Sequence, residues 1–130
     1  MNEMIEKIKA LIKNLEKDKG SLSICALFLR EDSMEKWDIV IAASWLNPAE
    51  MQSYKTISAK LQECLSASEL MQLSRIVILS QDDPVVSYLQ NLETITNGGY
   101  KELLLVNELS EKFKFVIKQA YLLRSQKSIS

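Results

Sequence analysis

The ten residues Trp37–Leu46, WDIVIAASWL, are the most informative segment of this chain for predicting its fold. Apolar side chains fall on both of its alternating faces, and this pattern predicts a strand that is buried on two sides. The run Ser21–Leu29 just before it has the same two-sided pattern. The polar segment Arg30–Lys36 between the two runs predicts a turn, so we expect the pair to form a hairpin inside a sheet.

The hairpin is followed by a helix whose start is marked by capping residues. Asn47 suits the N-cap, Pro48 the first helical position and Glu50 the third, from which its side chain can reach back to the Asn47 amide. The apolar stripe of this helix is Met51, Tyr54, Ile57, Leu61 and Leu65. We therefore expect the chain to leave the hairpin through a helix.

Three further elements are predicted after this helix. Ser66 and Glu69 have the spacing of a capping box, which predicts a short helical turn. Arg75–Ser80 is a buried run too short for a helix, which indicates a third strand. Asp83 then caps another helix, which the segment Asn97–Gly99 ends.

The N-terminal segment of residues 2–18 has the pattern of an amphipathic helix. Its apolar residues recur at steps of three and four, while charged residues fill the other positions. These apolar residues are Met4, Ile5, Ile8, Leu11, Ile12 and Leu15. Four of them also fit two heptads of a coiled-coil seam. The helix therefore packs either on its own sheet, which so short a seam favours, or on a second copy of itself.

The last third of the chain has a mixed pattern. Lys101–Glu108 reads as a strand, whereas residues 111–123 fit helical spacing as well as strand alternation. A β-branched pair and three aromatic residues favour a strand in 111–123, joined to the first by a turn at Ser110–Glu111. The polar residues 124–130 are expected to form a frayed tail.

Together these elements predict one α+β domain over residues 1–130. The expected order is α-β-β-α-β-α-β-β, with a mixed five-stranded sheet covered by about three helices. A chain of 130 residues with 47% hydrophobic and 25% charged content can bury a core without disulfides or metals. Cys25 and Cys64 lie in apolar surroundings without a redox or metal motif, and we expect both to be reduced core residues.

A candidate site follows from this order of elements. If the second and third strands run parallel across a crossover helix, their carboxyl ends lie at one end of the sheet, where α/β proteins commonly bind ligands. A second crossover would bring the end of the fourth strand to the same place. The residues at these strand ends are Trp45, Asn47, Asp82, Asp83, Asn107 and Glu108.

The carboxylates of this set suggest a metal-dependent alternative. Asp82, Asp83 and Glu108 could hold Mg²⁺ or Mn²⁺ through oxygen ligands, with a phosphate-containing substrate. Simpler roles compete with this one, because Asp83 suits a helix cap, Asp82 a solvated loop and Glu108 a hairpin. Trp45 is likewise explained by packing in the core. We favour the structural roles and expect neither a catalytic residue nor a cofactor.

Charge and residue usage exclude several classes of function. The chain has 16 basic and 17 acidic residues, and a net charge of -1 provides no field for holding a nucleic acid. It has no histidine, which excludes Ser-His-Asp catalysis, Cys-His catalysis and imidazole metal sites. The acidic residues around the first hairpin are expected to be exposed charges of its turn. They are Glu31, Asp32, Glu35 and Asp38.

The remaining expectation is a non-enzymatic interaction or regulatory module. The first helix and the C-terminal strand offer surfaces for self-association, which predicts a homodimer, and another protein is the other candidate partner. The start of the chain lacks the apolar core of a signal peptide, and no apolar run reaches the roughly 18 residues of a membrane span. We therefore expect a cytoplasmic location without membrane contact.

Overall fold

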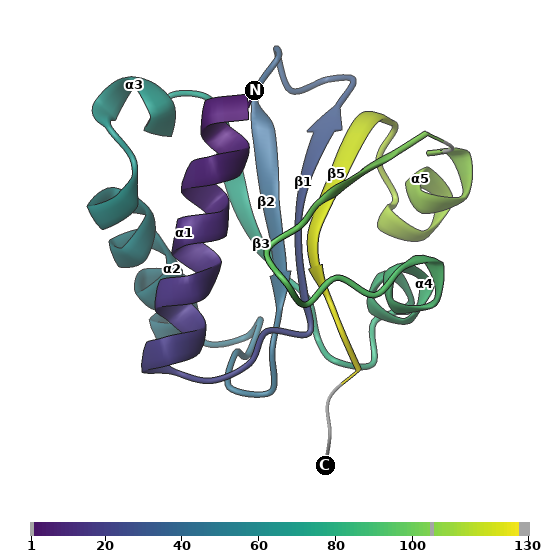
Figure 1. The fold of residues 1–130 in the computed structure, drawn as a ribbon. Coiled ribbons are helices and arrows are strands. Elements are labelled where there is room, and N and C mark those ends of the chain that lie inside the picture. Colours follow the sequence, from purple (N-terminus) through teal and green to yellow (C-terminus); the bar gives the residue numbers. More distant parts are fainter. Residues whose placement is uncertain (1, 105, 128–130) are drawn as a thin grey trace.

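The computed structural model describes residues 2–104 and 106–127, and a mixed five-stranded sheet lies at its centre (Figure 1). The strands are β1 (Ile24–Arg30), β2 (Trp37–Ala42), β3 (Leu73–Ile78), β4 (Lys101–Leu103) and β5 (Ile117–Ser125). The helices are α1 (Asn2–Asp18), α2 (Met51–Cys64), α3 (Ala67–Leu70), α4 (Pro84–Leu92) and α5 (Asn107–Phe113). The α+β class and the mixed five-stranded sheet are confirmed, and α5 is an additional helix.

Helices cover both faces of the sheet (Figure 1). α1 and α2 pack on one face, and α4 and α5 pack on the other. In β1, Leu27 belongs to the core under α1 and α2, whereas its neighbour Phe28 packs under α5, edge-on to Phe113 at 5.0 Å. The residues Ile24–Phe28 are all completely buried. Burial on two sides is what the apolar pattern of this strand predicted.

α1 packs on its own sheet through all of its predicted apolar residues. None of these side chains is more than 3% exposed, and Ile8, Leu11 and Leu15 have no exposed surface. The described residues 2–18 therefore leave no apolar seam on α1 for a second copy. The self-association surface expected on the first helix is wrong, because the sheet of the same chain covers it.

The strands lie in the order β3-β2-β1-β5-β4. β1 and β2 form the expected antiparallel hairpin, and β2 and β3 run parallel, joined through α2 and α3. The predicted capping box opens α3, with the Glu69 amide bound to the Ser66 hydroxyl and the Ser66 amide bound to the Glu69 carboxylate. β5 pairs antiparallel with both β1 and β4. The C-terminal strand therefore lies inside the sheet, and the expectation that it forms an open edge is wrong.

The strand expected at Lys101–Glu108 is shorter than predicted. β4 has only three residues, and α5 follows it. Helical spacing prevails over strand alternation in α5 because Leu109 and Phe113, four residues apart, are both buried in the core under α4 and α5. The turn predicted at Ser110–Glu111 is wrong, since both residues lie inside this helix.

β5 begins and ends later than the strand predicted at 111–123. Arg124 and Ser125 are 9% and 0% exposed, so the frayed tail expected from residue 124 is wrong for these two. Arg124 is held by Glu16 of α1, whose carboxylate lies 2.7 Å from its guanidinium. Residues 128–130 of the expected tail lie outside the described part of the chain.

Candidate functional site

The structure separates the six residues of the expected site. β2 and β3 are parallel, so their carboxyl ends meet at one end of the sheet, as expected. The residues that follow these ends are Trp45, Asn47, Asp82 and Asp83. β4 runs antiparallel to β2 and β3, because it is antiparallel to β5, β5 to β1, and β1 to β2. The expected second crossover is therefore wrong, and Asn107 and Glu108 follow a strand that ends at the opposite end of the sheet.

The two aspartates at the first end are engaged in their own loop. The side chain of Asp83 accepts a hydrogen bond from the Val85 amide at 2.8 Å, which confirms the predicted cap of α4. Asp82 accepts a hydrogen bond from the hydroxyl of Ser80. Within the described residues, no group of three or more Cys, Asp or Glu side chains is arranged to hold a metal ion.

Trp45 and Asn47 have structural contacts at the same end. Trp45 donates from Nε1 to the carbonyl of Gly20 at 3.1 Å, and its ring lies where a side chain at Gly20 would point. Gly20 also has a φ of 124°, which favours glycine. Asn47 accepts from the Ala49 amide at 2.9 Å and donates to Glu50 at 3.1 Å, but α2 begins only after Glu50. The N-cap expected at Asn47 is therefore wrong, because this residue closes a turn before the helix.

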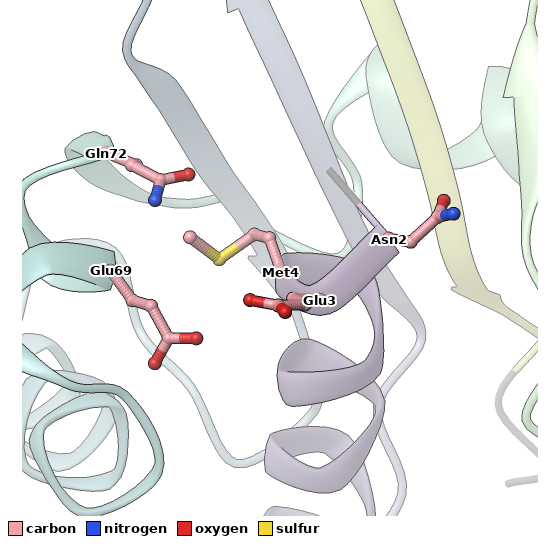
Figure 2. A pocket seen from close by; sticks show the side chains of 5 residues that line it. All are labelled: Asn2, Glu3, Met4, Glu69 and Gln72. Carbon is pink, nitrogen blue, oxygen red and sulfur yellow. The ribbon is translucent and has the colours of Figure 1, made fainter.

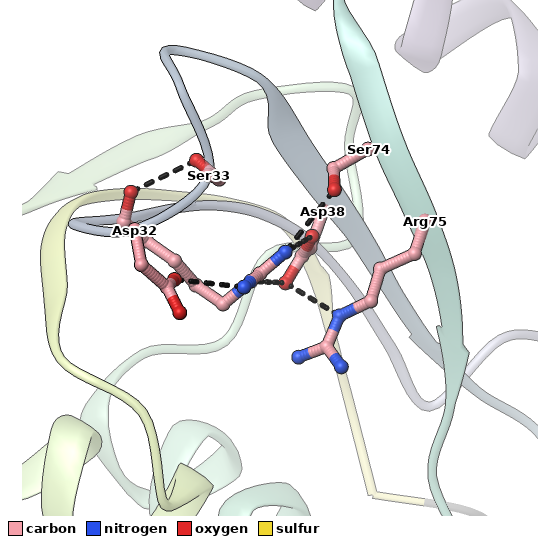
Figure 3. A network of polar contacts seen from close by, with 6 residues as sticks. Asp32, Ser33, Asp38, Ser74 and Arg75 are labelled. Atoms are coloured by element: carbon pink, nitrogen blue, oxygen red, sulfur yellow. Dashed lines mark hydrogen bonds and ion pairs between the residues drawn. The ribbon is translucent and has the colours of Figure 1, made fainter.

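The opposite end of the sheet carries a buried cluster of charges. Asp38, near the start of β2, has no exposed surface, and its carboxylate binds two arginines (Figure 3). Oδ2 of Asp38 lies 2.7 Å from Nε of Arg30 and 3.0 Å from Nε of Arg75. We call Arg30, Asp38 and Arg75 the Arg–Asp–Arg cluster. It links the side chains of three neighbouring strands, β1, β2 and β3.

The strand register brings these three side chains together. Asp38 pairs with Phe28 of β1, and Arg30, two residues further along β1, points to the same face. The register of β2 and β3 shifts between Trp37 and Asp38, and this irregularity places Arg75 directly beside Asp38. A lone buried carboxylate is costly by several kcal/mol, so the two guanidiniums are what permit the burial of Asp38.

Arg30 uses its donors inside the protein. Beyond its bond to Asp38, it donates from Nη1 to Asp32 at 2.8 Å and from Nη2 to the hydroxyl of Ser74 at 3.1 Å. Hydrogen bonding to Asp38 raises the pKa of Arg30 above its ordinary value, so the guanidinium stays charged. Its side chain is only 12% exposed. Arg30 therefore holds Asp38 and has little capacity to bind a ligand.

Arg75 is placed in the opposite way. Among the residues that the structure describes, its two terminal nitrogens have no hydrogen-bond partner, and Figure 3 shows them pointing away from Asp38. The guanidinium carbon lies 4.5 Å from the ring centre of Phe115 and 5.7 Å from that of Phe113. The bond at Nε and these aromatic contacts hold the group in place. They leave a planar pair of donors that matches a carboxylate or phosphate.

Arg75 belongs to an edge strand with a groove beside it. In the described part of the chain β3 pairs only with β2, and Leu73, Ile76 and Val77 are half-buried. A groove of about 230 Å³ lies between β3, α2 and α3. It is lined by Ser58, Leu61, Gln62, Leu70, Leu73, Ser74, Arg75 and Ile76. We call the edge of Leu73–Ile78, this groove and the Arg75 guanidinium together the β3 surface.

Another hollow, of about 430 Å³, lies at the start of α1 (Figure 2). It is lined by Asn2, Glu3, Met4, Glu69 and Gln72. Glu69 is already engaged in the capping box of α3, where the Ser66 amide lowers the pKa of its carboxyl, and Lys7 lies 3.9 Å away. The Glu69 carboxylate in this hollow is thus explained by the local structure.

Sequence reasoning missed the Arg–Asp–Arg cluster. The prediction that Asp38 is an exposed charge of the hairpin is wrong, because Arg30 and Arg75 compensate its charge inside the sheet. A signal was present, since Asp38 interrupts an otherwise apolar two-sided strand and Arg75 opens an apolar run. A charge inside a buried strand needs a partner of opposite sign. Arginines at the ends of neighbouring strands were the available partners.

Comparisons of the chain with protein family models, with curated proteins and with solved structures found no match. No helix in the described residues is long and apolar enough to cross a membrane. The geometry of the β3 surface is therefore the basis for assigning a function.

Proposed function

We propose that the protein is a non-enzymatic interaction module that binds another polypeptide chain at the β3 surface. The observation that carries this proposal is the open edge of β3, whose six residues, LSRIVI, include four apolar ones and neither lysine nor proline. Edge strands usually carry such residues, bulges or cover to prevent pairing with other chains. β3 has one irregularity, at Ser74, where its register with β2 shifts, but from Arg75 to Ile78 it pairs regularly with β2, and this part of its outer edge is suited to pairing through its backbone.

Features of the potential catalytic groups support binding over catalysis. The chain has no histidine. The buried carboxylate of Asp38 is engaged by two guanidiniums. Burial raises the pKa of the Cys25 thiol to about 12, too high for a nucleophile near neutral pH. The best-placed group for contact with another molecule is the guanidinium of Arg75, whose planar donors suit the binding of an anion.

The proposal includes a weak homodimer formed through the same edge. Two β3 strands paired antiparallel about a two-fold axis would join two sheets into one. Equivalent faces of the two sheets become continuous only when residues that point to the same face lie opposite each other. For a pairing near the centre of β3, this condition places Arg75 opposite either Arg75 or Val77 of the second copy. Both arrangements place the two Arg75 side chains on one face as near neighbours. Repulsion between like charges therefore keeps this dimer weak.

Light scattering between tens and hundreds of micromolar tests this proposal. The wild-type mass should rise with concentration from the 14.8 kDa of the monomer toward twice that value. Val77→Lys should stay monomeric, because a lysine on an edge strand disfavours pairing. Glu102→Lys, on the edge strand β4, is the matched control and should behave as the wild type. A constant monomer mass would contradict the homodimer, and an equal effect of both variants would contradict the role of β3.

A further inference from the structure

We infer that the β3 surface binds an extended acidic segment of a partner protein, with one carboxylate of that segment held by Arg75. The inference rests on the proposed function, because it uses the same open edge. The chemical class of the partner segment follows from the charge of Arg75, the groove beside β3 and the alternation of side chains along a strand.

The charge complementarity is located at Arg75. Arg30 contacts two carboxylates, those of Asp38 and Asp32, whereas Arg75 shares only that of Asp38. The formal charges of Arg30, Arg75, Asp32 and Asp38 balance, but the side chain of Arg75 is 37% exposed and, among the described residues, its two terminal nitrogens have no acceptor. Since Nε is occupied by Asp38, an anion can approach in the plane of the guanidinium only at its two terminal nitrogens. A carboxylate fits this position with two parallel hydrogen bonds.

The side chain of Arg75 is held in one position before a partner arrives, and this favours binding. Its Nε is held by a completely buried carboxylate, and its planar group lies against Phe115. An arginine that is fixed before the partner arrives loses less side-chain freedom on binding than one on an open surface. The contact is therefore stronger than that of an ordinary exposed arginine with the same carboxylate.

The groove determines the rest of the pattern. The Arg75 guanidinium lies on the face of the sheet that bears α4 and α5, whereas the side chain of Ile76, the next residue, packs on the face of α2 and α3; both residues border the groove at the edge of β3. A strand added beside β3 directs successive side chains to these two faces in turn. Its acidic residues then reach Arg75 while its apolar residues enter the groove. The partner segment should therefore alternate apolar and acidic residues.

An acidic segment is a better occupant of this edge than a second copy of the chain. A second copy offers the same apolar strand but brings another Arg75 close to the first. An acidic segment replaces this repulsion by attraction at the same position. Loss of the Arg75 charge should therefore have opposite effects, weakening the binding of an acidic strand and strengthening the homodimer.

Two short peptides with blocked ends serve as probes of this inference, one alternating Val and Glu and the other alternating Val and Gln. Each is titrated into the isotope-labelled full chain, and amide chemical shifts are followed by NMR. Both peptides should shift amides of β3 and α2. The Glu peptide should bind about tenfold more tightly at low salt, and high salt should reduce the difference.

Variants of Arg75 separate the inference from the proposed function. Arg75→Gln should weaken binding of the Glu peptide about tenfold, leave the Gln peptide unchanged and raise the mass seen by light scattering. Unchanged binding of the Gln peptide also shows that the variant is folded. Arg75→Lys keeps the charge without the paired donors and should lie between wild type and Arg75→Gln. Lys101→Gln, on β4, is the matched control and should bind both peptides as the wild type does.

Two results would overturn the inference. Equal affinity of the two peptides for the wild-type β3 edge would contradict the preference for an acidic partner, but would be consistent with an interaction module that binds polypeptides at β3. Shifts confined to residues outside β3 and α2 would remove both the inference and the proposed function.

Discussion

At one edge of the sheet β4 has three residues, two of which, Lys101 and Glu102, are exposed and charged, whereas at the other edge β3 has six residues and one charge. That single charge belongs to Arg75, which donates a hydrogen bond to Asp38 and packs against the ring of Phe115. Short and charged edges discourage pairing with other chains, and longer apolar edges favour it. The chain therefore protects one side of its sheet and leaves the other side accessible.

The comparison also shows that a charge protects an edge only while it is solvated. Lys101 lies 2.9 Å from Glu93 but keeps 55% of its side chain exposed, so an incoming strand would have to remove water from it. Arg75 has already lost part of its hydration to Asp38 and Phe115. Covering Arg75 with a partner therefore costs less than covering Lys101.

The largest expected effect concerns the ionic contacts of the two edge-strand charges, Arg75 of β3 and Lys101 of β4. Asp38→Ala leaves Arg30 and Arg75 without their buried partner and should lower the free energy of unfolding by about 3 kcal/mol. Glu93→Ala removes the exposed partner of Lys101 and should lower it by less than about 1 kcal/mol. Urea unfolding followed by circular dichroism measures both. Similar losses of unfolding free energy in Asp38→Ala and Glu93→Ala would show that the ionic contacts of Arg75 and Lys101 contribute equally to stability.

Thiol labelling compares the centre of the sheet with the helix that borders the β3 groove. Cys25 lies in β1 without exposed surface, whereas Cys64 of α2 is partly exposed. Burial raises the pKa of Cys25 to about 12, so little thiolate forms near neutral pH. Labelling of the folded protein with a maleimide or disulfide reagent should be roughly a hundredfold slower at Cys25 than at Cys64. The Cys25 rate should still be rising above pH 9, because the thiolate accumulates only near that raised pKa. Rapid labelling of Cys25 at pH 7 would contradict its place in the core.

A smaller effect is expected at the start of α4, the helix through which the chain leaves the β3 edge toward β4. Asp83→Ala removes the cap of α4 and should cost about 1 kcal/mol of stability, while Asp82→Ala should change it by less than about 0.5 kcal/mol. Millimolar Mg²⁺ should leave the melting temperature of the wild type unchanged. A rise in melting temperature with Mg²⁺ that Asp82→Ala abolishes would instead support the metal-dependent alternative.

Prediction from the sequence was most accurate where the residues fit only one periodicity, either helical spacing or strand alternation. The two-sided pattern of β1 and β2, the apolar stripe of α1 and the caps at Asp83 and Ser66 all correspond to observed elements. Residues 111–123 satisfy two periodicities, and tertiary packing divides them between α5, which ends at Phe113, and β5, which begins at Ile117. No local pattern contains that information.

The candidate site was harder to predict because it depends on pairing between distant strands. Asp38, Arg30 and Arg75 become neighbours only through the register of β1, β2 and β3 and its shift at Trp37. The open edge of β3 likewise follows from the strand order, since the C-terminal strand enters the interior of the sheet. Sequence reasoning correctly placed the carboxyl ends of β2 and β3 together, but the more distinctive groups lie at the opposite end.

The position of β5 has a consequence for how the protein is made. Of the five strands described, β5 is the last to leave the ribosome, yet it lies between β1 and β4 and joins them. Until Ser125 has emerged, β1 lacks the strand that pairs with one of its edges, and α4 and α5 lack part of the sheet on which they pack. Long-range pairing of this kind is slow to form. The nascent chain therefore exposes apolar surface until β5 has emerged. Folding of this domain should be completed only then, in a step that inserts β5 between β1 and β4.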